Sequence, residues 1–367
     1  MTRKSVFLVI IAVYIAVFSV HAWYLQKTVY GDGIFYYSWL RSVVVDRDIH
    51  FANEYLKSSV SQPMITETKP GNKYSIGPAL FWAPPYVAIH TALRGDGWTL
   101  AYQVAAGVTS VAASLAGLIL LTRLPRFPSA VIASTILLLA GATNLLFYGA
   151  IDPVNSHALS FFCAVIFLAF LGMPQKNWSA IGVSLALLAS VRLQDLVYVL
   201  LLLPHAKQIR WQNLLAGFGI GFIPQLAAWY ALYGTLANPY LAGGEGFTFL
   251  RPHMWGVLFG IQNGLFLWTP IVAVGVYGLL SKWRKYRMYL LIFGLQLYFV
   301  SSWSTWWQGA SVSGRMFVST LPLIAYGISE VISTLYRHRI LRGVLPHITV
   351  SVCVINALGI AYYLVSH

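Results

Sequence analysis

The apolar residues of this chain gather in about eleven long runs that short polar gaps separate. Most runs have roughly the 17–25 residues that an α-helix needs to cross a bilayer. They cover residues 5–25, 76–93, 100–122, 129–150, 157–172, 179–203, 212–233, 256–280, 288–302, 316–335 and 344–364. The pattern predicts an all-α polytopic membrane protein, with residues 1–367 forming one transmembrane domain of about eleven helices.

The polar gaps give the helices an expected direction. Basic residues concentrate at 282–287 and 336–342, with two more at 207–210. Short basic gaps of this kind face the cytoplasm. The segments 234–255 and 303–314 are therefore expected on the outer side.

Two arrangements of the first half of the chain remain open. In the first, every run crosses the membrane in simple alternation, which places Arg123 and Arg126 outside. In the second, the proline-containing run 76–93 is a re-entrant or interfacial hairpin, and the run 179–203 is interrupted at 192–195. The second arrangement places both arginines inside and follows the charge rule better.

The polar segment 26–75 follows the first apolar run and is the expected first extracytoplasmic loop. It carries five of the ten acidic residues of the chain. Within it, residues 34–46 have a polar stripe and an aromatic remainder, which predicts an amphipathic helix at the membrane interface. Asp32 lies between two glycines just before this helix, where a carboxylate can cap the helix or take part in chemistry.

Composition supports a membrane protein and excludes several other classes. The chain is 58% hydrophobic and 9% charged, with a mean hydropathy of +0.69. Its net charge of +14 comes from the short gaps, so it indicates membrane orientation and no nucleic-acid partner. Cys163 and Cys353 lie in apolar runs, so no disulfide is expected. No zinc-type spacing, phosphate-binding loop or dinucleotide glycine motif occurs.

A series of short motifs resembles the GT-C fold glycosyltransferases, membrane enzymes that use polyprenyl-phosphate-linked sugars. Protein O-mannosyltransferases and the aminoarabinose transferases of lipid A belong to this group. The resemblance extends over nearly the whole chain, and the order of the motifs carries it. They are Gly31-Asp32-Gly33, the stretch 71–85, Asn155-Ser156-His157-Ala158 with Phe161-Phe162, the stretch 264–270, and Trp303 to Gly309 followed by Gly314-Arg315.

The resemblance implies an acidic general base in the first outer loop, and Asp32 matches that position. Most members have a second acid beside it, but this chain has Gly33 there. Asp46 and Asp48 form the only Asp-x-Asp triplet, so they are alternative candidates for a base or for a divalent metal ligand, Mg²⁺ or Mn²⁺. They also suit a solvated helix end.

Three cations are candidates for holding the donor phosphate. Lys73 begins the segment that carries a phosphate-contacting lysine in the lipid A branch of the family. Arg315 follows Gly314 at the start of an apolar run, and Arg192 lies inside one, where a charge needs a partner or a ligand.

Further candidates are aromatic or lie on the outer segments. His157, Trp306 and Trp307 could contact substrate, with the indoles acting as a stacking platform for a sugar. Each also has an ordinary reading, as a buried structural histidine or as part of an interfacial aromatic belt. Glu245 lies in a glycine-rich outer segment that could close over a site.

The expected function is that of an inverting glycosyltransferase, facing outward from a bacterial inner membrane. It would transfer a sugar from a polyprenyl-phosphate donor to a hydroxyl of a glycan, lipid or protein acceptor. Two alternatives remain. A transporter or flippase would bind the same lipid without chemistry, although no internal repeat of the transporter type is visible. An O-antigen polymerase or ligase would use pyrophosphate-linked donors.

Overall fold

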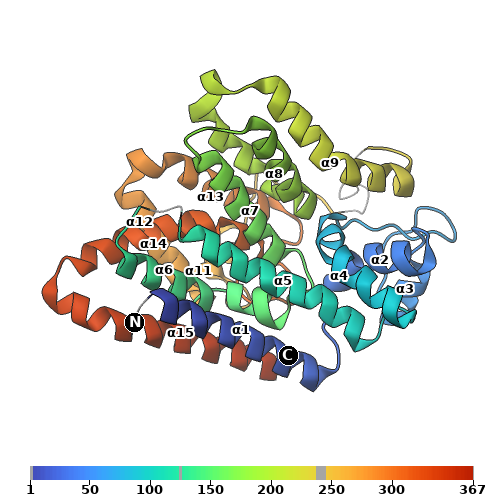
Figure 1. Cartoon of the computed structure of the whole chain (residues 1–367), viewed down its shortest axis with the longest axis horizontal. Coiled ribbons are helices and arrows are strands. Elements are labelled where there is room, and N and C mark those ends of the chain that lie inside the picture. The colour runs from blue at the N-terminus through green and yellow to red at the C-terminus, as the bar shows by residue number, and fades with distance from the viewer. Residues whose placement is uncertain (1–2, 124–125, 237–244, 367) are drawn as a thin grey trace.

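The computed structural model describes residues 3–123, 126–236 and 245–366, and these residues fold into helices joined by short connections (Figure 1). Within them no β-strand forms. The helices are α1 (Arg3–Leu25), α2 (Gly33–Arg41), the π-helix η1 (Ser42–Asp46), α3 (Ala52–Ser58), α4 (Gly77–Leu93), α5 (Leu100–Leu121), α6 (Ser129–Gly141), the π-helix η2 (Phe147–Ile151), α7 (His157–Gly172), α8 (Trp178–Val191), the 3₁₀-helix η3 (Leu193–Gln208), α9 (Trp211–Tyr233), α10 (Met254–Phe259), α11 (Leu265–Trp268), α12 (Pro270–Ser281), α13 (Trp283–Ser302), the 3₁₀-helix η5 (Arg315–Thr320), α14 (Leu321–Tyr336) and α15 (Arg339–Ser366).

Five of the described helices are long and apolar enough to cross a membrane. They are α1, α5, α9, η5 with α14, and α15. Four shorter apolar helices, α6, α7, α8 and α12, have 10–17 residues. The structure is therefore that of an all-helical protein with several helices suited to a bilayer, and the count of about eleven spans remains a prediction.

Three of the predicted apolar runs are broken in the structure. The run 129–150 divides where α6 ends at Gly141, and η2 begins only at Phe147. The run 179–203 divides at Arg192, whose extended backbone (φ −148°, ψ 112°) ends α8 before η3 begins. This break agrees with the second arrangement. The hairpin that the same arrangement expects at 76–93 is wrong, because α4 runs unbroken from Gly77 to Leu93 with two prolines inside it. The run 256–280 was expected to be one helix, and that expectation is wrong. It forms α10, α11 and α12, because glycines at 260 and 264 interrupt the helix and Pro270 begins a new one.

Glycine contacts bring two pairs of helices close together. A Cβ atom on Gly278 of α12 would lie 2.0 Å from the carbonyl oxygen of Gly327 on α14. A Cβ atom on Gly182 of α8 would lie 2.2 Å from the carbonyl oxygen of Leu214 on α9. Close backbone approach at small residues is how apolar helices associate in a bilayer, where lipid and leucine are equally apolar.

The predicted helix at 34–46 is present as α2 and η1, but its environment differs from the prediction. Every residue of α2 is buried in the protein. Its aromatic side chains pack on α4 and its flanking segments, for example through the bond from Tyr37 Oη to the Gly97 carbonyl. The polar stripe by itself suits a helix at the membrane interface. The packing of α3 and α4 around α2 buries the helix inside the protein instead (Figure 1).

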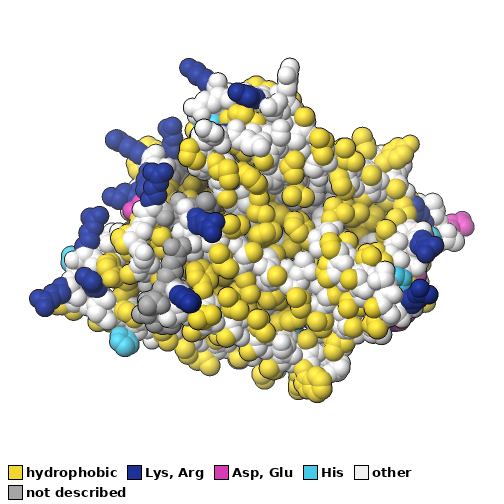
Figure 2. Space-filling view, in the orientation of Figure 1, with side chains coloured by type: hydrophobic (Ala, Val, Ile, Leu, Met, Phe, Trp, Pro, Cys, Tyr) yellow, Lys and Arg dark blue, Asp and Glu magenta, His cyan; other side chains and the backbone are white. Residues whose placement is uncertain are grey.

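Basic side chains gather on one side of the molecule. Figure 2 shows most of the visible Lys and Arg side chains near α12, α13 and the start of α15, and few over α2 and α3. Lys285 Nζ lies 5.8 Å from the centroid of the Phe127 ring and 3.0 Å from Glu330 Oε1. The connection between α5 and α6 therefore lies beside the basic connection at 282–287, as the second arrangement requires.

Candidate functional site

Asp32 is the centre of a cluster of polar side chains from distant parts of the chain. It occupies the N-cap position of α2 but makes no capping hydrogen bond. Instead, its Oδ1 accepts a hydrogen bond of 2.8 Å from Tyr74 Oη, and its Oδ2 lies 2.8 Å from Arg315 Nη1. The carboxylate is 31% exposed, so a small molecule can reach it. Asp32 thus joins α2 to the segments that carry Tyr74 and Arg315 and does not cap the helix.

The glycine next to Asp32 has a packing reason. A Cβ atom on Gly33 would lie 2.1 Å from the carbonyl oxygen of Val154. The first turn of α2 is therefore pressed against the connection between η2 and α7. No acidic side chain therefore fits at residue 33. The connection between η2 and α7, which fills this space, carries Asp152.

Arg315 begins η5, directly after Gly314, and lies largely inside the protein with a side-chain exposure of 16%. Of its donors, Nη1 pairs with Asp32, whereas Nε is buried and has no hydrogen-bond partner in the described chain. A buried donor without a partner is costly, because it loses water and gains nothing in return. Arg315 therefore has donor capacity left for an anion beside Asp32.

Arg192 supplies a second guanidinium from the break between α8 and η3. Its Nη1 donates to Ser156 Oγ at 2.9 Å and contacts His157 Nδ1 at 3.2 Å, and its Nε is again buried without a partner. No carboxylate of the described residues lies within ion-pair distance of it. Tyr36 joins the two arginines, because it hydrogen-bonds to Ser156 and interacts electrostatically with Arg192, Arg315 and Asp32.

His157 is a buried packing residue at the start of α7. Its ring stacks at an angle on Tyr148, with centroids 4.6 Å apart, and its exposed fraction is 3%. One ring nitrogen faces Arg192, so the histidine orients that arginine. His157 also interacts electrostatically with Arg315 and hydrogen-bonds to its backbone, so it belongs to the buried part of the cluster.

Lys73 precedes Tyr74, the residue that donates to Asp32. It forms an ion pair with Glu245, and its Nζ lies 5.6 Å from the centroid of the Tyr74 ring. Since Tyr74 donates to Asp32, the lysine is separated from the carboxylate by one aromatic side chain. Glu245 precedes Gly246, whose carbonyl accepts a bond of 2.9 Å from Ser304 N. This segment therefore connects Lys73 with the tryptophan-rich turn, residues 303–309.

Asp152 is a member of the site that the sequence reasoning missed. Its Oδ1 is buried and has no partner among the described residues, and Arg315 and Asp32 both interact with it electrostatically. Burial raises the pKa of this carboxyl to about 7. A usable signal was present, since Asp152 is a lone acid only three residues before Asn155, which belongs to one of the recognised motifs.

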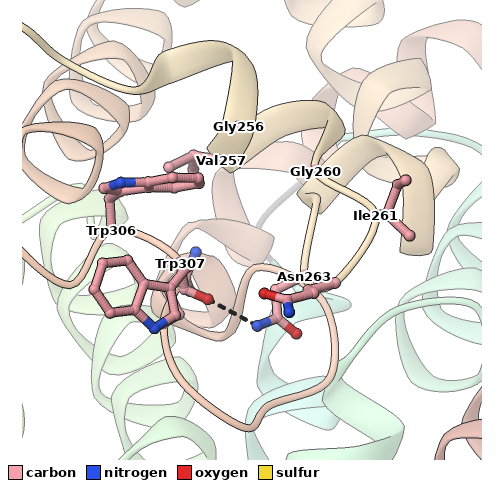
Figure 3. Close-up of a pocket in the computed structure, with 9 residues that line it drawn as sticks. Gly256, Val257, Gly260, Ile261, Asn263, Trp306 and Trp307 are labelled. Atoms are coloured by element: carbon pink, nitrogen blue, oxygen red, sulfur yellow. Dashed lines mark hydrogen bonds between the residues drawn. The ribbon is translucent and has the colours of Figure 1, made fainter.

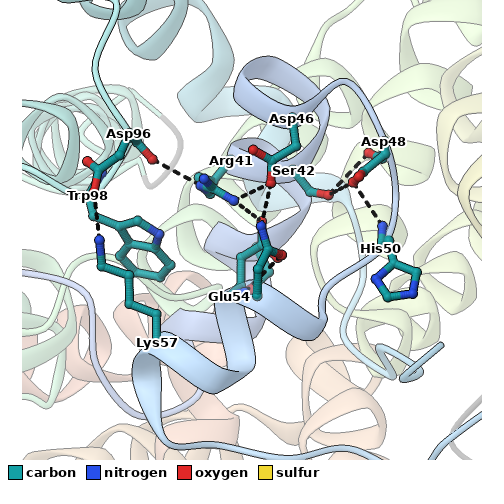
Figure 4. Close-up of polar contacts among 12 residues, drawn as sticks. Arg41, Ser42, Asp46, Asp48, His50, Glu54, Lys57, Asp96 and Trp98 are labelled. Atoms are coloured by element: carbon teal, nitrogen blue, oxygen red, sulfur yellow. Dashed lines mark hydrogen bonds and ion pairs between the residues drawn. The ribbon is translucent and has the colours of Figure 1, made fainter. Parts of the chain in front are cut away.

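Asp46 and Asp48 lie in a separate network at the far end of the α2–η1 helix (Figure 4). Asp46 pairs with Arg41 and accepts a bond of 2.7 Å from Asn53 Nδ2. Asp48 accepts bonds from Ser42 Oγ at 2.6 Å and from the His50 amide at 3.0 Å. Because a helix rises by about 1.5 Å per residue, they lie roughly 20 Å from Asp32. These bonds fix the end of the helix, so the two acids are not part of the Asp32 cluster.

Trp306 and Trp307 line a pocket of about 250 Å³ together with Gly256, Gly260 and Asn263 of the broken 256–280 run (Figure 3). The two indoles are nearly perpendicular, with centroids 6.0 Å apart, and both lie beside the cavity. Asn263 Nδ2 donates to the carbonyls of Trp307 and Gly309 at 2.7 Å each and holds the turn in place.

This pocket is connected to the Asp32 cluster through the backbone. Gln308 lines the pocket, and its Oε1 accepts a bond of 3.1 Å from the amide of Met316, the residue after Arg315. The tryptophan pocket and the segment that carries Arg315 are therefore neighbours.

Among the described residues no group of three or more His, Cys, Asp or Glu side chains could hold a metal ion. Comparisons with models of protein families, with curated proteins and with solved structures find no match.

Proposed function

We propose that the protein is a membrane glycosyltransferase that moves a sugar from a polyprenyl-phosphate donor to an acceptor hydroxyl. The observation that carries the proposal is the contact between Asp32 and Arg315. One guanidinium holds a partly exposed carboxylate through Nη1 and keeps a buried Nε without a partner. A base and a phosphate-binding donor thereby belong to one site, and sugar transfer from a lipid phosphate requires both.

In the proposed reaction, Asp32 accepts the proton of the acceptor hydroxyl. The oxygen forms a bond to the anomeric carbon of the sugar, and the bond between that carbon and the phosphate oxygen breaks. The electron pair leaves with the polyprenyl phosphate, whose growing negative charge Arg315 and Lys73 stabilise. Attack from the side opposite the phosphate inverts the anomeric configuration.

Arg192 is proposed to complete the phosphate site. Its Nε has no partner in the described chain. Arg192 and Arg315 both interact electrostatically with Tyr36, which lies between them in this network of contacts. Glu245 forms an ion pair with Lys73 in this structure. A donor phosphate that binds Lys73 would displace the Glu245 carboxylate. The indoles of Trp306 and Trp307 offer apolar faces to a sugar or to the first isoprene units.

The site is proposed to face outward from a bacterial inner membrane. The basic connections at 282–287 and beside Phe127 lie together at one side of the molecule, and the acidic segment with α2 and α3 lies away from them (Figure 2). The acceptor would be a glycan, lipid or protein. Bilayer lipids would surround α15, most of which is exposed on the surface of the protein.

The decisive experiment uses the purified protein in lipid nanodiscs with a polyprenyl-phosphate sugar and an extract of envelope acceptors. Asp32→Asn keeps the size of the side chain and removes its basicity, so transfer should fall by roughly 10²–10⁴ while donor binding changes little. The control is Glu67→Gln, an exposed acid of the same segment. Activity of Asp32→Asn within a few-fold of wild type would exclude Asp32 as the base.

The same preparation separates an enzyme from a transporter. A flippase moves the intact donor across the membrane and needs no base, so Asp32→Asn would leave flipping in proteoliposomes unchanged. Donor that crosses the bilayer without any transferred product would favour the transporter.

A further inference from the structure

Asp195, near the start of η3, is a fully buried carboxylate with an exposed fraction of 0%. Its Oδ1 accepts a bond of 2.7 Å from Gln296 Nε2 of α13 and another of 2.7 Å from Ser319 Oγ of η5. Its Oδ2 accepts a bond from Ser160 Oγ of α7. Three elements distant in sequence therefore donate to one side chain.

The first turn of η3 holds η5 through several further contacts. Gln194 Nε2 donates to the Met316 carbonyl at 2.9 Å, and Tyr198 Oη donates to the Ser319 carbonyl at 2.5 Å. Arg192 also contacts the sulfur of Met316. The residues on both sides of Asp195 thus bind the backbone of the short helix that begins with Arg315.

The short helix η5 is held at its C-terminal end by α14, into which it continues, but its own turns are weak. It is a six-residue 3₁₀-helix, and 3₁₀ geometry gives weak hydrogen bonds that rarely continue beyond one or two turns. It also follows the irregular segment 303–314, which supplies no regular backbone support. Arg315 lies at the end of η5 that is farthest from α14, next to Gly314, whose carbonyl accepts a bond of 3.2 Å from Asn144 Nδ2. The place of its guanidinium therefore depends on side-chain contacts that reach η5 from other elements.

A buried carboxylate is an expensive way to hold a helix, because a charge loses its hydration. An apolar side chain of similar volume would give equal or better stability but would not specify one position of η5. The carboxylate does, since Ser319 must face it to satisfy both groups. The positive charge of Arg192, three residues away, partly offsets the cost.

We propose that Asp195 is a positioning residue that fixes Arg315 and Arg192 relative to each other, so that the two guanidinium groups form a preformed clamp for one lipid phosphate. The inference rests on the proposed function, because it concerns the same phosphate. Asp195 touches neither donor nor acceptor and acts through Ser319 and the η3–η5 contact.

The test compares two serines that donate to the same carboxylate from different elements. Ser319→Ala removes the bond from η5, whereas Ser160→Ala removes the bond from α7, and the two serines have exposed fractions of 1% and 0%. The probe is farnesyl phosphate, titrated into the protein in nanodiscs. A misplacement of about 1 Å can cost on the order of a hundredfold, so Ser319→Ala should weaken binding by roughly tenfold or more.

Ser160→Ala should lower the melting temperature as much as Ser319→Ala does but change the Kd of farnesyl phosphate less than about twofold, because it leaves η5 held. In transfer assays Ser319→Ala should raise KM for the donor and leave kcat within about twofold. Asp195→Asn loses the negative charge, so it should raise KM for the donor more than Ser319→Ala does.

The outcomes are distinct. Equal loss of binding in both serine variants would mean that Asp195 only supports stability, and the inference would be overturned. Wild-type affinity in Ser319→Ala and Asp195→Asn would overturn it as well, with the proposed function intact. No binding of farnesyl phosphate by the wild-type protein would overturn the proposed function and this inference together.

Discussion

At the scale of single residues, Arg315 has the most demanding role. It is tied to Asp32 by one nitrogen and keeps Nε free of any partner in the described chain. A planar guanidinium can serve a carboxylate and a phosphate at once, because its donors point in fixed, different directions. A lysine ammonium in the same place would serve as a single point of charge.

Replacing Arg315 tests this division of donors. Arg315→Ala should weaken binding of farnesyl phosphate by about 2 kcal/mol, roughly thirtyfold, and Arg315→Lys should recover only part of the loss. Isothermal titration with the protein in nanodiscs measures both. An alanine variant with wild-type affinity would reduce Arg315 to a residue at the boundary of an apolar helix.

Asp152 gives a prediction about pH. The carboxyl of the unfolded chain titrates near about 3.9, whereas burial raises its pKa in the folded protein to about 7. The folded state therefore keeps this proton up to a higher pH than the unfolded chain does. The contribution of Asp152 to stability is full below about pH 4 and is lost as the pH rises to about 7. Asp152→Asn cannot ionise and avoids this loss.

The melting temperature of Asp152→Asn relative to wild type should thus be higher at pH 8 than at pH 5, by roughly 1–3 °C. Asp96→Asn is a control of opposite sign. A hydrogen bond from Lys57 lowers the pKa of Asp96, so its contribution is present at neutral pH and is lost on acidification. If the difference in melting temperature between Asp152→Asn and wild type does not change with pH, burial does not hold the Asp152 carboxyl protonated.

At the scale of elements, the site depends on how closely α2 approaches the connection between η2 and α7. Gly33 permits that approach, since its missing Cβ would lie 2.1 Å from the Val154 carbonyl. Asp32 is the residue before it, and Asp152 lies in the segment it touches. The two acids thus come near Arg315 through one backbone contact.

A methyl group at this contact should separate the elements. Gly33→Ala should destabilise the protein by about 1–3 kcal/mol and lower transfer activity by more than the loss of folded protein explains. Gly219→Ala is the matched control, because it lies within α9 with no atom near the added methyl. Thermal unfolding and activity per folded molecule give the comparison. Wild-type activity in Gly33→Ala would show that the approach of α2 is not required.

At the scale of the whole molecule, the side of the membrane that holds the Asp32 cluster decides which sugar donors can reach it. Single cysteines at Ser61 and Ser304, both exposed, should react with an impermeant thiol reagent in intact cells that express a Cys163→Ser, Cys353→Ser background. A cysteine at Ser281, beside the basic connection, should react only after lysis. Labelling at position 61 only after lysis would place Asp32 in the cytoplasm and remove the outward-facing donor from the proposal.

Local sequence determined the helices and some of their ends. Long apolar runs become helices wherever they lie, because a backbone in an apolar environment must satisfy its own hydrogen bonds. The interruption at Arg192 and the helix after Asp32 could be predicted for the same reason: charge, glycine and proline act on neighbouring residues. Asp32 and Arg315 were likewise identifiable one at a time, from their own surroundings.

Tertiary structure alone decided which of these residues meet. The pair of Asp32 with Arg315 and the bond from Ser319 to Asp195 join segments far apart in the chain. The burial of α2 and the inclusion of Asp152 depend likewise on which helices pack around them. A residue's sequence neighbours fix its local conformation, but its distant partners follow from helix packing, which no single stretch of sequence encodes.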